Sequence, residues 1–270
     1  MALHCLISPG GSPGVSTTAL GLALAWPGRV LLAECDPMGR RVLPGFMADR
    51  MRASAGPGLL GLAMAAEADP QGPFALEEYV VPITDDGHAG LLHGVRDPRH
   101  GMRLRPVWRR LAEALLARDG DVLADLGRVG GTDTPTELLK AADAVVMVLK
   151  PTVTQVDAAA ARLDALKELV GAQAAIRLCL IADGAYGAAD VERVLGFPVL
   201  AELPCSLADA RVLSDGARPR LTFKTSLLVR SLDVLGQRIR ATVAEPGTAV
   251  TTLNEVRRSA PPLAASGVRR

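Results

Sequence analysis

The chain has 270 residues, of which 49% are hydrophobic and only 3% aromatic, and its formal net charge is +1. These values indicate one large or two small folded domains, and they exclude a polyanion partner for the chain as a whole. No apolar stretch reaches the ~18 residues that span a bilayer. A Ser-Pro-Gly-Gly sequence also interrupts the opening apolar run. We therefore expect no signal peptide and a cytoplasmic protein.

Strand-like apolar segments alternate with helical segments along the whole chain. In chain order, we predict strands at residues 3–8, 29–34, 79–83, 89–92, 121–126, 144–149, 176–181 and 199–203. The predicted helices span residues 16–26, 58–66, 104–118, 134–142, 155–170, 188–195, 207–215 and 225–241. Several strands are apolar on both faces, which is typical of a parallel sheet covered on both sides. The alternation predicts an α/β fold with a doubly wound, mostly parallel sheet flanked by helices.

Two segments interrupt this alternation. Residues 46–78 are rich in Pro, Gly and small residues, and we expect a helix-plus-loop insertion there. From residue 242 onward the apolar periodicity is lost. We therefore predict one domain over residues 1–241 and a disordered tail over 242–270.

A glycine-rich loop joins the first predicted strand to the first predicted helix. Strand, glycine-rich loop, Ser/Thr and helix is the layout of a phosphate-binding P-loop, in which backbone N–H groups converge on an anion. The alternative is a glycine-rich turn with no ligand. The predicted nucleotide-binding residues are Gly10, Gly11, Ser12, Pro13, Gly14, Val15, Ser16, Thr17 and Thr18.

Carboxylates follow two other strands. Glu34 and Asp36 are two residues apart after the second strand, and we expect both to point toward a ligand crevice. Asp125 ends an apolar strand, as the Mg²⁺-directed Asp of a P-loop protein does. If a nucleotide binds, the predicted Mg²⁺ ligands are Thr18, Asp36 and Asp125, and Asp36 is the catalytic candidate. The alternatives are a helix cap at Asp36 and a structural carboxylate at Asp125.

In this order, the features resemble the ParA/MinD family of deviant Walker P-loop ATPases, which position plasmids, chromosomes, division sites and pilus machines. The resemblance covers residues 3–241 and is most similar to the divergent TadZ/CpaE-like branch tied to pilus assembly. The segments that carry it are Gly10-Gly11 with Thr17-Thr18, Glu34-Cys35-Asp36-Pro37, Asp125-Leu126-Gly127, the run from Ala142 to Lys150-Pro151, and the run from Leu195 to Pro204.

The chain departs from this family at its two loop lysines, which are replaced by Gly10 and Thr17. A P-loop lysine partly neutralises the β- and γ-phosphates. Losing one such charge-stabilising group costs ~3–4 kcal/mol of barrier. The Walker A motif is therefore degenerate, and we expect ATP and Mg²⁺ binding to be weak or absent and hydrolysis very slow. An arginine could substitute, and the candidates are Arg40, Arg41 and Arg128.

Three functions follow from this resemblance. The first is a degenerate ParA/MinD-like factor that dimerises through its P-loop face and recruits a protein partner of a pilus, secretion or DNA-partition system. Such a partner would bring it to the membrane or the nucleoid. The second is an active ATP-dependent partition or positioning switch with Arg in place of Lys. The third, a metabolic enzyme on the same fold, is disfavoured because such enzymes keep the lysine.

Residues 206–241 contain seven basic and three acidic residues, a local excess of four positive charges. Non-specific DNA binding is one interpretation of this patch, and a solvated basic face is the other.

Overall fold

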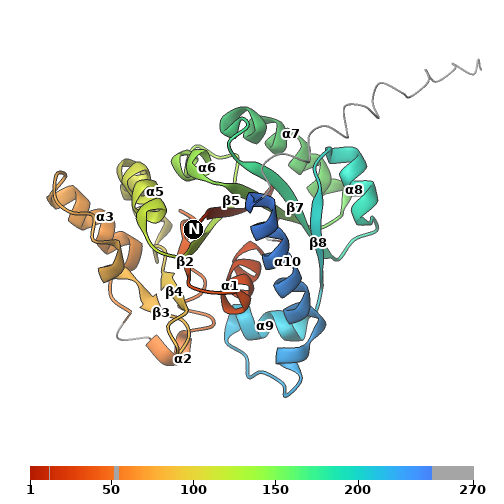
Figure 1. Cartoon of the computed structure of the whole chain (residues 1–270), viewed down its shortest axis with the longest axis horizontal. Coiled ribbons are helices and arrows are strands. Elements are labelled where there is room, and N and C mark those ends of the chain that lie inside the picture. The colour runs from red at the N-terminus through yellow and green to blue at the C-terminus, as the bar shows by residue number, and fades with distance from the viewer. Residues whose placement is uncertain (12, 52–54, 245–270) are drawn as a thin grey trace, which may run out of the picture.

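The sheet of this protein, seen in a computed structural model that describes residues 1–11, 13–51 and 55–244, has β1 near its centre (Figure 1). Eight strands pair in the order β3-β4-β2-β5-β1-β6-β7-β8. The β3–β4 pair is antiparallel, and the other neighbouring pairs are parallel. The strands are β1 (Leu3–Ser8), β2 (Val30–Glu34), β3 (Val81–Pro82), β4 (Ala89–Leu92), β5 (Asp121–Arg128), β6 (Ala144–Leu149), β7 (Ala175–Ala182) and β8 (Val199–Pro204).

Helices cover both faces of this sheet, which confirms the predicted doubly wound α/β fold (Figure 1). One face packs against α1 (Val15–Ala25), α9 (Leu207–Asp215) and α10 (Leu227–Ala244). The other packs against α3 (Gly58–Ala68), α5 (Trp108–Ala117), α6 (Thr136–Ala141), α7 (Val153–Val170) and α8 (Ala188–Leu195). Short helices complete the described chain: α2 (Ala48–Met51), α4 (Gly101–Leu104), and the 3-10 turns η1 (Leu76–Tyr79), η2 (Pro98–His100), η3 (Arg105–Val107) and η4 (Phe223–Thr225).

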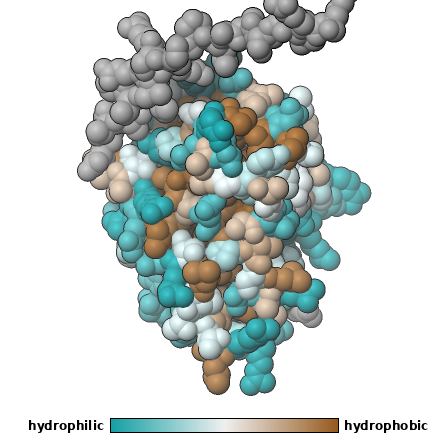
Figure 2. Space-filling view, turned by 90° about the vertical axis from the view of Figure 1, so that its right-hand side faces the viewer, coloured by the Kyte–Doolittle hydropathy of each residue, from teal (hydrophilic) through white to brown (hydrophobic). Residues whose placement is uncertain are grey.

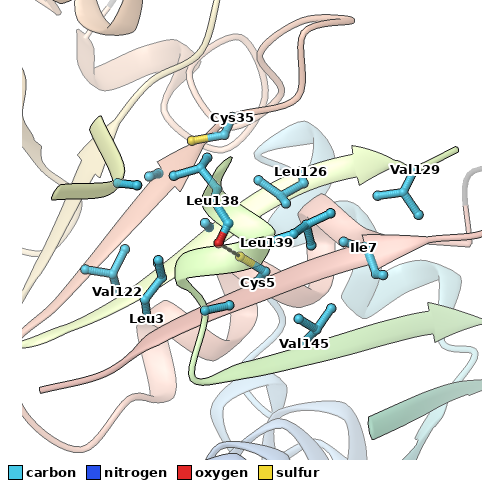
Figure 3. Packing of buried hydrophobic residues seen from close by; sticks show 14 of the residues in the cluster. Leu3, Cys5, Ile7, Cys35, Val122, Leu126, Val129, Leu138, Leu139 and Val145 are labelled. Carbon is cyan, nitrogen blue, oxygen red and sulfur yellow. Dashed lines mark hydrogen bonds between the residues drawn. The ribbon is translucent and has the colours of Figure 1, made fainter. Parts of the chain in front are cut away.

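Strand β1 shows how sequence alternation divides the core into two layers. Leu3, Cys5 and Ile7 point to the α5–α8 side, where Figure 3 shows them among Leu138 and Leu139 of α6. Leu6 points to the opposite side and joins the α1–α10 layer. Because successive side chains in a strand point to opposite faces, a strand that is apolar throughout can be buried on both sides.

Three predicted elements differ from the structure. The predicted 104–118 helix is broken into α4, η3 and α5, because Pro106 lacks the N–H that a continuous helix needs. The predicted 79–83 strand shrinks to the two-residue β3. Helix α10 runs to Ala244, so residues 242–244 of the predicted tail are helical. The remainder of that tail, 245–270, lies outside the described residues, as does Ser12 of the predicted loop.

Strand β8 forms one edge of the sheet, on the side of the molecule drawn in Figure 2. There, apolar residues are scattered among hydrophilic ones (Figure 2). Arg238 of α10 donates to the Leu200 carbonyl of this strand, and Glu202 is exposed. Charged residues along an edge strand oppose its pairing with another chain. Over the described residues, no helix is long and apolar enough to cross a membrane.

Candidate functional site

The loop after β1 reaches the start of α1 through three glycines with positive φ. Gly10, Gly11 and Gly14 have φ of 152°, 67° and 112°, and Gly14 is the left-handed N-cap of α1. No described side chain caps this helix end. The N–H groups of its first turn have no intrahelical acceptor. They are therefore free to bind an anion.

A cavity of about 870 Å³ opens beside this loop. That volume lies in the range of ordinary small-molecule sites. Three parts of the chain form its walls: the loop with α1, the segment after β2, and the end of β5 with the C-terminal end of α9. The lining residues are Ser8, Gly11, Gly14, Val15, Ser16, Thr17, Leu20, Asp36, Met38, Arg40, Arg41, Val42, Pro44, Gly45, Gly127, Arg128, Leu213, Ser214 and Asp215.

Asp36 lines this cavity and packs against the backbone of Gly127. Its Oδ1 accepts a hydrogen bond from the N–H of Met38 at 2.8 Å. Burial raises the pKa of Asp36, and the nearby charges of Arg41 and Arg128 oppose that rise. Asp36 is thus the one predicted Mg²⁺ ligand that faces the cavity.

Asp125 is buried at the centre of the sheet, under the loop. Its Oδ1 accepts from the N–H of Gly127 at 2.9 Å, and the Ser16 hydroxyl donates to the same carboxyl group. Burial is the largest cause that raises the pKa of Asp125 from 3.8 to about 7, and the charges of Asp36 and Glu34 add to it. Neither Asp125 nor Thr18, which is 3% exposed, lines the cavity. The predicted Mg²⁺ ligands therefore do not open onto one common space.

The expectation that Glu34 points into the crevice is wrong. The Glu34 side chain is buried, and its oxygens accept from the backbone N–H groups of Arg41, Val42 and Gly94. Strand β2 ends at Glu34, so the alternation that would have aligned Glu34 with Asp36 stops there. Glu34 holds the segment that carries Arg40 and Arg41, and does not face a ligand.

The loop between β1 and α1 is contacted by different side chains on its β6 side and on its β5 side. On the β6 side, the Gln155 Oε1 accepts from the N–H of Lys150 at 2.8 Å, and its Nε2 packs on Gly11. Lys150 pairs with Asp183 at 2.5 Å. On the β5 side, Arg128 passes over Gly10, and the cavity opens. The side of the loop that faces the cavity is therefore the side on which Arg40, Arg41 and Arg128 lie.

Sequence reasoning missed the wall formed by α9. Gly45 packs so closely on the backbone of Ser214 that a Cβ there would lie closer than 3.0 Å to the Ser214 carbonyl oxygen. This contact joins segments about 170 positions apart, and no local motif marks it. In the sequence, only Gly45 and Gly216 could have indicated this contact, since a glycine allows two backbone segments to approach closely.

We expect Gly127→Ala to lower the free energy of unfolding by about 2–5 kcal/mol. The φ of Gly127 is 61°, where a Cβ costs about 1–2 kcal/mol. The added methyl would also lie closer than 3.0 Å to the Asp36 carboxyl group, and overpacking costs about 1–3 kcal/mol. Gly87→Ala is the matched control, because Gly87 has φ of 70° and open space around it. If urea denaturation shows that both variants lose the same free energy of unfolding, the Asp36 side chain moves away from the added methyl without cost.

The fold is similar to that of MinD and ParA family proteins of known structure. The septum site-determining protein MinD of Pyrococcus horikoshii, complexed with Mg-ADP, aligns with a TM-score of 0.70 at 16% identity, over 92% of this chain and 99% of that one. A ParA family ATPase from Chlorobium tepidum aligns with a TM-score of 0.67 at 15% identity, over 87% and 97%. A chain of the MinC:MinD cell division protein complex from Aquifex aeolicus aligns with a TM-score of 0.67 at 15% identity, over 89% of this chain and 96% of that one. No family model and no curated protein matches the sequence. These likenesses show a shared fold.

Proposed function

We propose that this chain is a ParA/MinD-like protein that acts in the subcellular positioning or assembly of a machine. It works as a homodimer that recruits a protein partner, and it turns over ATP very slowly or not at all. The observation that carries this proposal is a P-loop-shaped site without a lysine. The four lysines of the chain are Lys140, Lys150, Lys167 and Lys224, and none of them lines the cavity.

The finer assignment rests on the resemblance to TadZ/CpaE-like proteins, with a degenerate Walker A motif. The proposed partner belongs to a pilus, secretion or partition system and recruits the protein to the membrane or the nucleoid. Exposed basic side chains on α9, on α10 and between them support a second contact, with DNA, through residues 206–241.

The alternative is an active ATP-dependent positioning switch. One observation favours it, because Arg40, Arg41 and Arg128 all line the cavity and can replace the missing lysines. Steady-state ATP hydrolysis separates the two. If the Walker A motif is degenerate, as we propose, the rate of ATP hydrolysis should be far below ~1 s⁻¹, the low end for ordinary enzymes. A faster rate that Asp125→Ala abolishes would favour the switch.

Dimerisation is tested at Met38, which is 50% exposed at the cavity rim. We expect Met38→Asp to weaken self-association in sedimentation velocity, since a charge buried in an interface without a partner is costly. Met64→Asp is the control, because Met64 is also 50% exposed but lies on α3, outside the cavity lining. A wild-type protein that stays monomeric at all concentrations, with and without ATP, would refute the dimer.

A further inference from the structure

The loop between α9 and α10, residues 216–226, projects from the molecule. Its ribbon reaches the lower edge of the protein in Figure 1, and hydrophobic and hydrophilic side chains project side by side from the same end in Figure 2. Leu221, in the middle of this loop, is 105% exposed, and Leu227, where α10 begins, is 60% exposed. A scattered exposed leucine is ordinary on a protein surface, but a fully exposed one on a projecting loop points to a partner.

The loop is held in one shape by its own contacts. The Phe223 N–H donates to the Arg220 carbonyl at 3.0 Å, and the Thr225 N–H donates to the Thr222 carbonyl at 3.1 Å. The side chain of Phe223 packs against the core layer of α1 and α10. The loop therefore turns Phe223 inward and leaves Leu221 outside. Because this arrangement exists before any partner binds, little ordering is needed to bury Leu221 elsewhere.

Positive charge surrounds Leu221 along the loop. Arg218, Arg220 and Lys224 are exposed, and residues 216–226 contain no acidic residue. The structure shows no ion pair between these three side chains and any residue that it describes. Basic side chains beside an exposed apolar one match the interface of an anionic membrane, where phosphates lie above hydrocarbon. DNA phosphates would engage the cations but would leave the leucine in water.

We propose that the 216–226 loop docks this protein directly on an anionic lipid surface. Leu221 enters the headgroup layer, and Leu227 adds apolar contact beside it. The three basic side chains of the loop contact lipid phosphates. The inference deepens the recruitment part of the proposed function, since it gives the chain a membrane contact of its own. Two leucines bury less apolar surface than one acyl chain, so the binding is weak and reversible.

The first test is flotation of the full chain with lipid vesicles. One set of vesicles contains phosphatidylcholine alone, and the other contains equal parts of phosphatidylcholine and phosphatidylglycerol. We expect the protein to float with the anionic vesicles only, and added salt to weaken this binding. Equal binding to both sets of vesicles, or to neither, would overturn the inference.

The leucine and the charges are tested separately. Leu221→Ser should weaken binding to the anionic vesicles about tenfold or more, the effect of one buried leucine side chain. Arg220→Gln should weaken it about fivefold, the effect of one cation near the surface. Val194→Ser is the control, because Val194 is 67% exposed on α8, which covers the opposite face of the sheet. Circular dichroism melts verify that each variant folds. If Leu221→Ser binds as wild type does, the loop does not insert and the inference is wrong.

A tryptophan at position 221 reports where the loop lies. Trp26 and Trp108 are buried, so Leu221→Trp adds the exposed indole whose fluorescence should respond. We expect a blue shift with anionic vesicles, because the indole leaves water, and no shift with duplex DNA at the same salt concentration. The DNA contact proposed for residues 206–241 is the competing use of this loop. If DNA binds the wild type and anionic vesicles do not, the loop serves DNA and the inference is wrong.

The two proposals fail separately. If the wild-type protein does not bind anionic vesicles but dimerises in sedimentation velocity, the lipid contact is wrong and the positioning role stands. If it binds the vesicles through Leu221 but remains monomeric, the lipid contact is as inferred and the dimer-based function is wrong.

Discussion

Replacing Glu34 with Ala should lower the free energy of unfolding by about 3 kcal/mol or more and release the segment after β2. The Glu34 Oε1 accepts from the N–H groups of Arg41 at 2.5 Å and Val42 at 2.8 Å, and its Oε2 accepts from Gly94 at 3.2 Å. Each buried N–H that loses its acceptor costs about 1–3 kcal/mol. Urea denaturation measures the loss, and limited proteolysis locates it.

Glu34→Gln separates the acceptor role from the charge. A glutamine keeps the size of the side chain and one carbonyl oxygen for Arg41 and Val42, but it presents an amide donor to the N–H of Gly94. We expect about half the loss of the Ala variant, because about half of the acceptor oxygens remain. Protease cleavage should appear within residues 38–47 in the Ala variant first. An Ala variant as stable and as protease-resistant as wild type would show that other contacts hold this segment.

The fold could be predicted largely from sequence because its signals are local. Strands β1, β4 and β6 and helices α8 and α9 begin and end at the predicted residues. Their apolar runs and flanking turn residues determine them without help from distant segments. The 46–83 region was less predictable. Pro82, the short β3 and the helices before it depend on packing against the sheet edge, which no periodicity encodes.

The site was predictable only in part. The positive-φ glycines of the loop and the position of Asp36 follow from local sequence and parallel-sheet geometry. The inward turn of Glu34 does not, because its partners at Gly94 and Val42 are brought together only by the folded chain. The wall from α9 is likewise a long-range contact. The glycine-rich loop between β1 and α1 was therefore accessible to sequence reasoning, and the contribution of α9 to the cavity lining was not.

Asp125→Asn should stabilise the protein above about pH 7, by about 2–4 kcal/mol. Burial raises the pKa of Asp125 to about 7, so the folded protein keeps a proton there that the unfolded chain loses near pH 4. Each pKa unit of difference is worth 1.36 kcal/mol. Because the unfolded state binds fewer protons between these two values, the wild-type free energy of unfolding falls as pH rises from about 4 to about 7. Asparagine cannot ionise, and it resembles the protonated acid in shape and hydrogen bonding.

The stability difference between the variant and wild type should therefore be small near pH 4, grow up to about pH 7 and stay constant above it. Part of the gain comes from Asp36 and Glu34, whose ionisation the Asp125 charge also opposes. Asp119→Asn is the control, since Asp119 is exposed just before β5, and its pH profile should follow wild type. Urea denaturation from pH 4 to pH 9 measures all three proteins. Parallel profiles for wild type and Asp125→Asn would mean that Asp125 is ionised in the folded protein and that a cation compensates it.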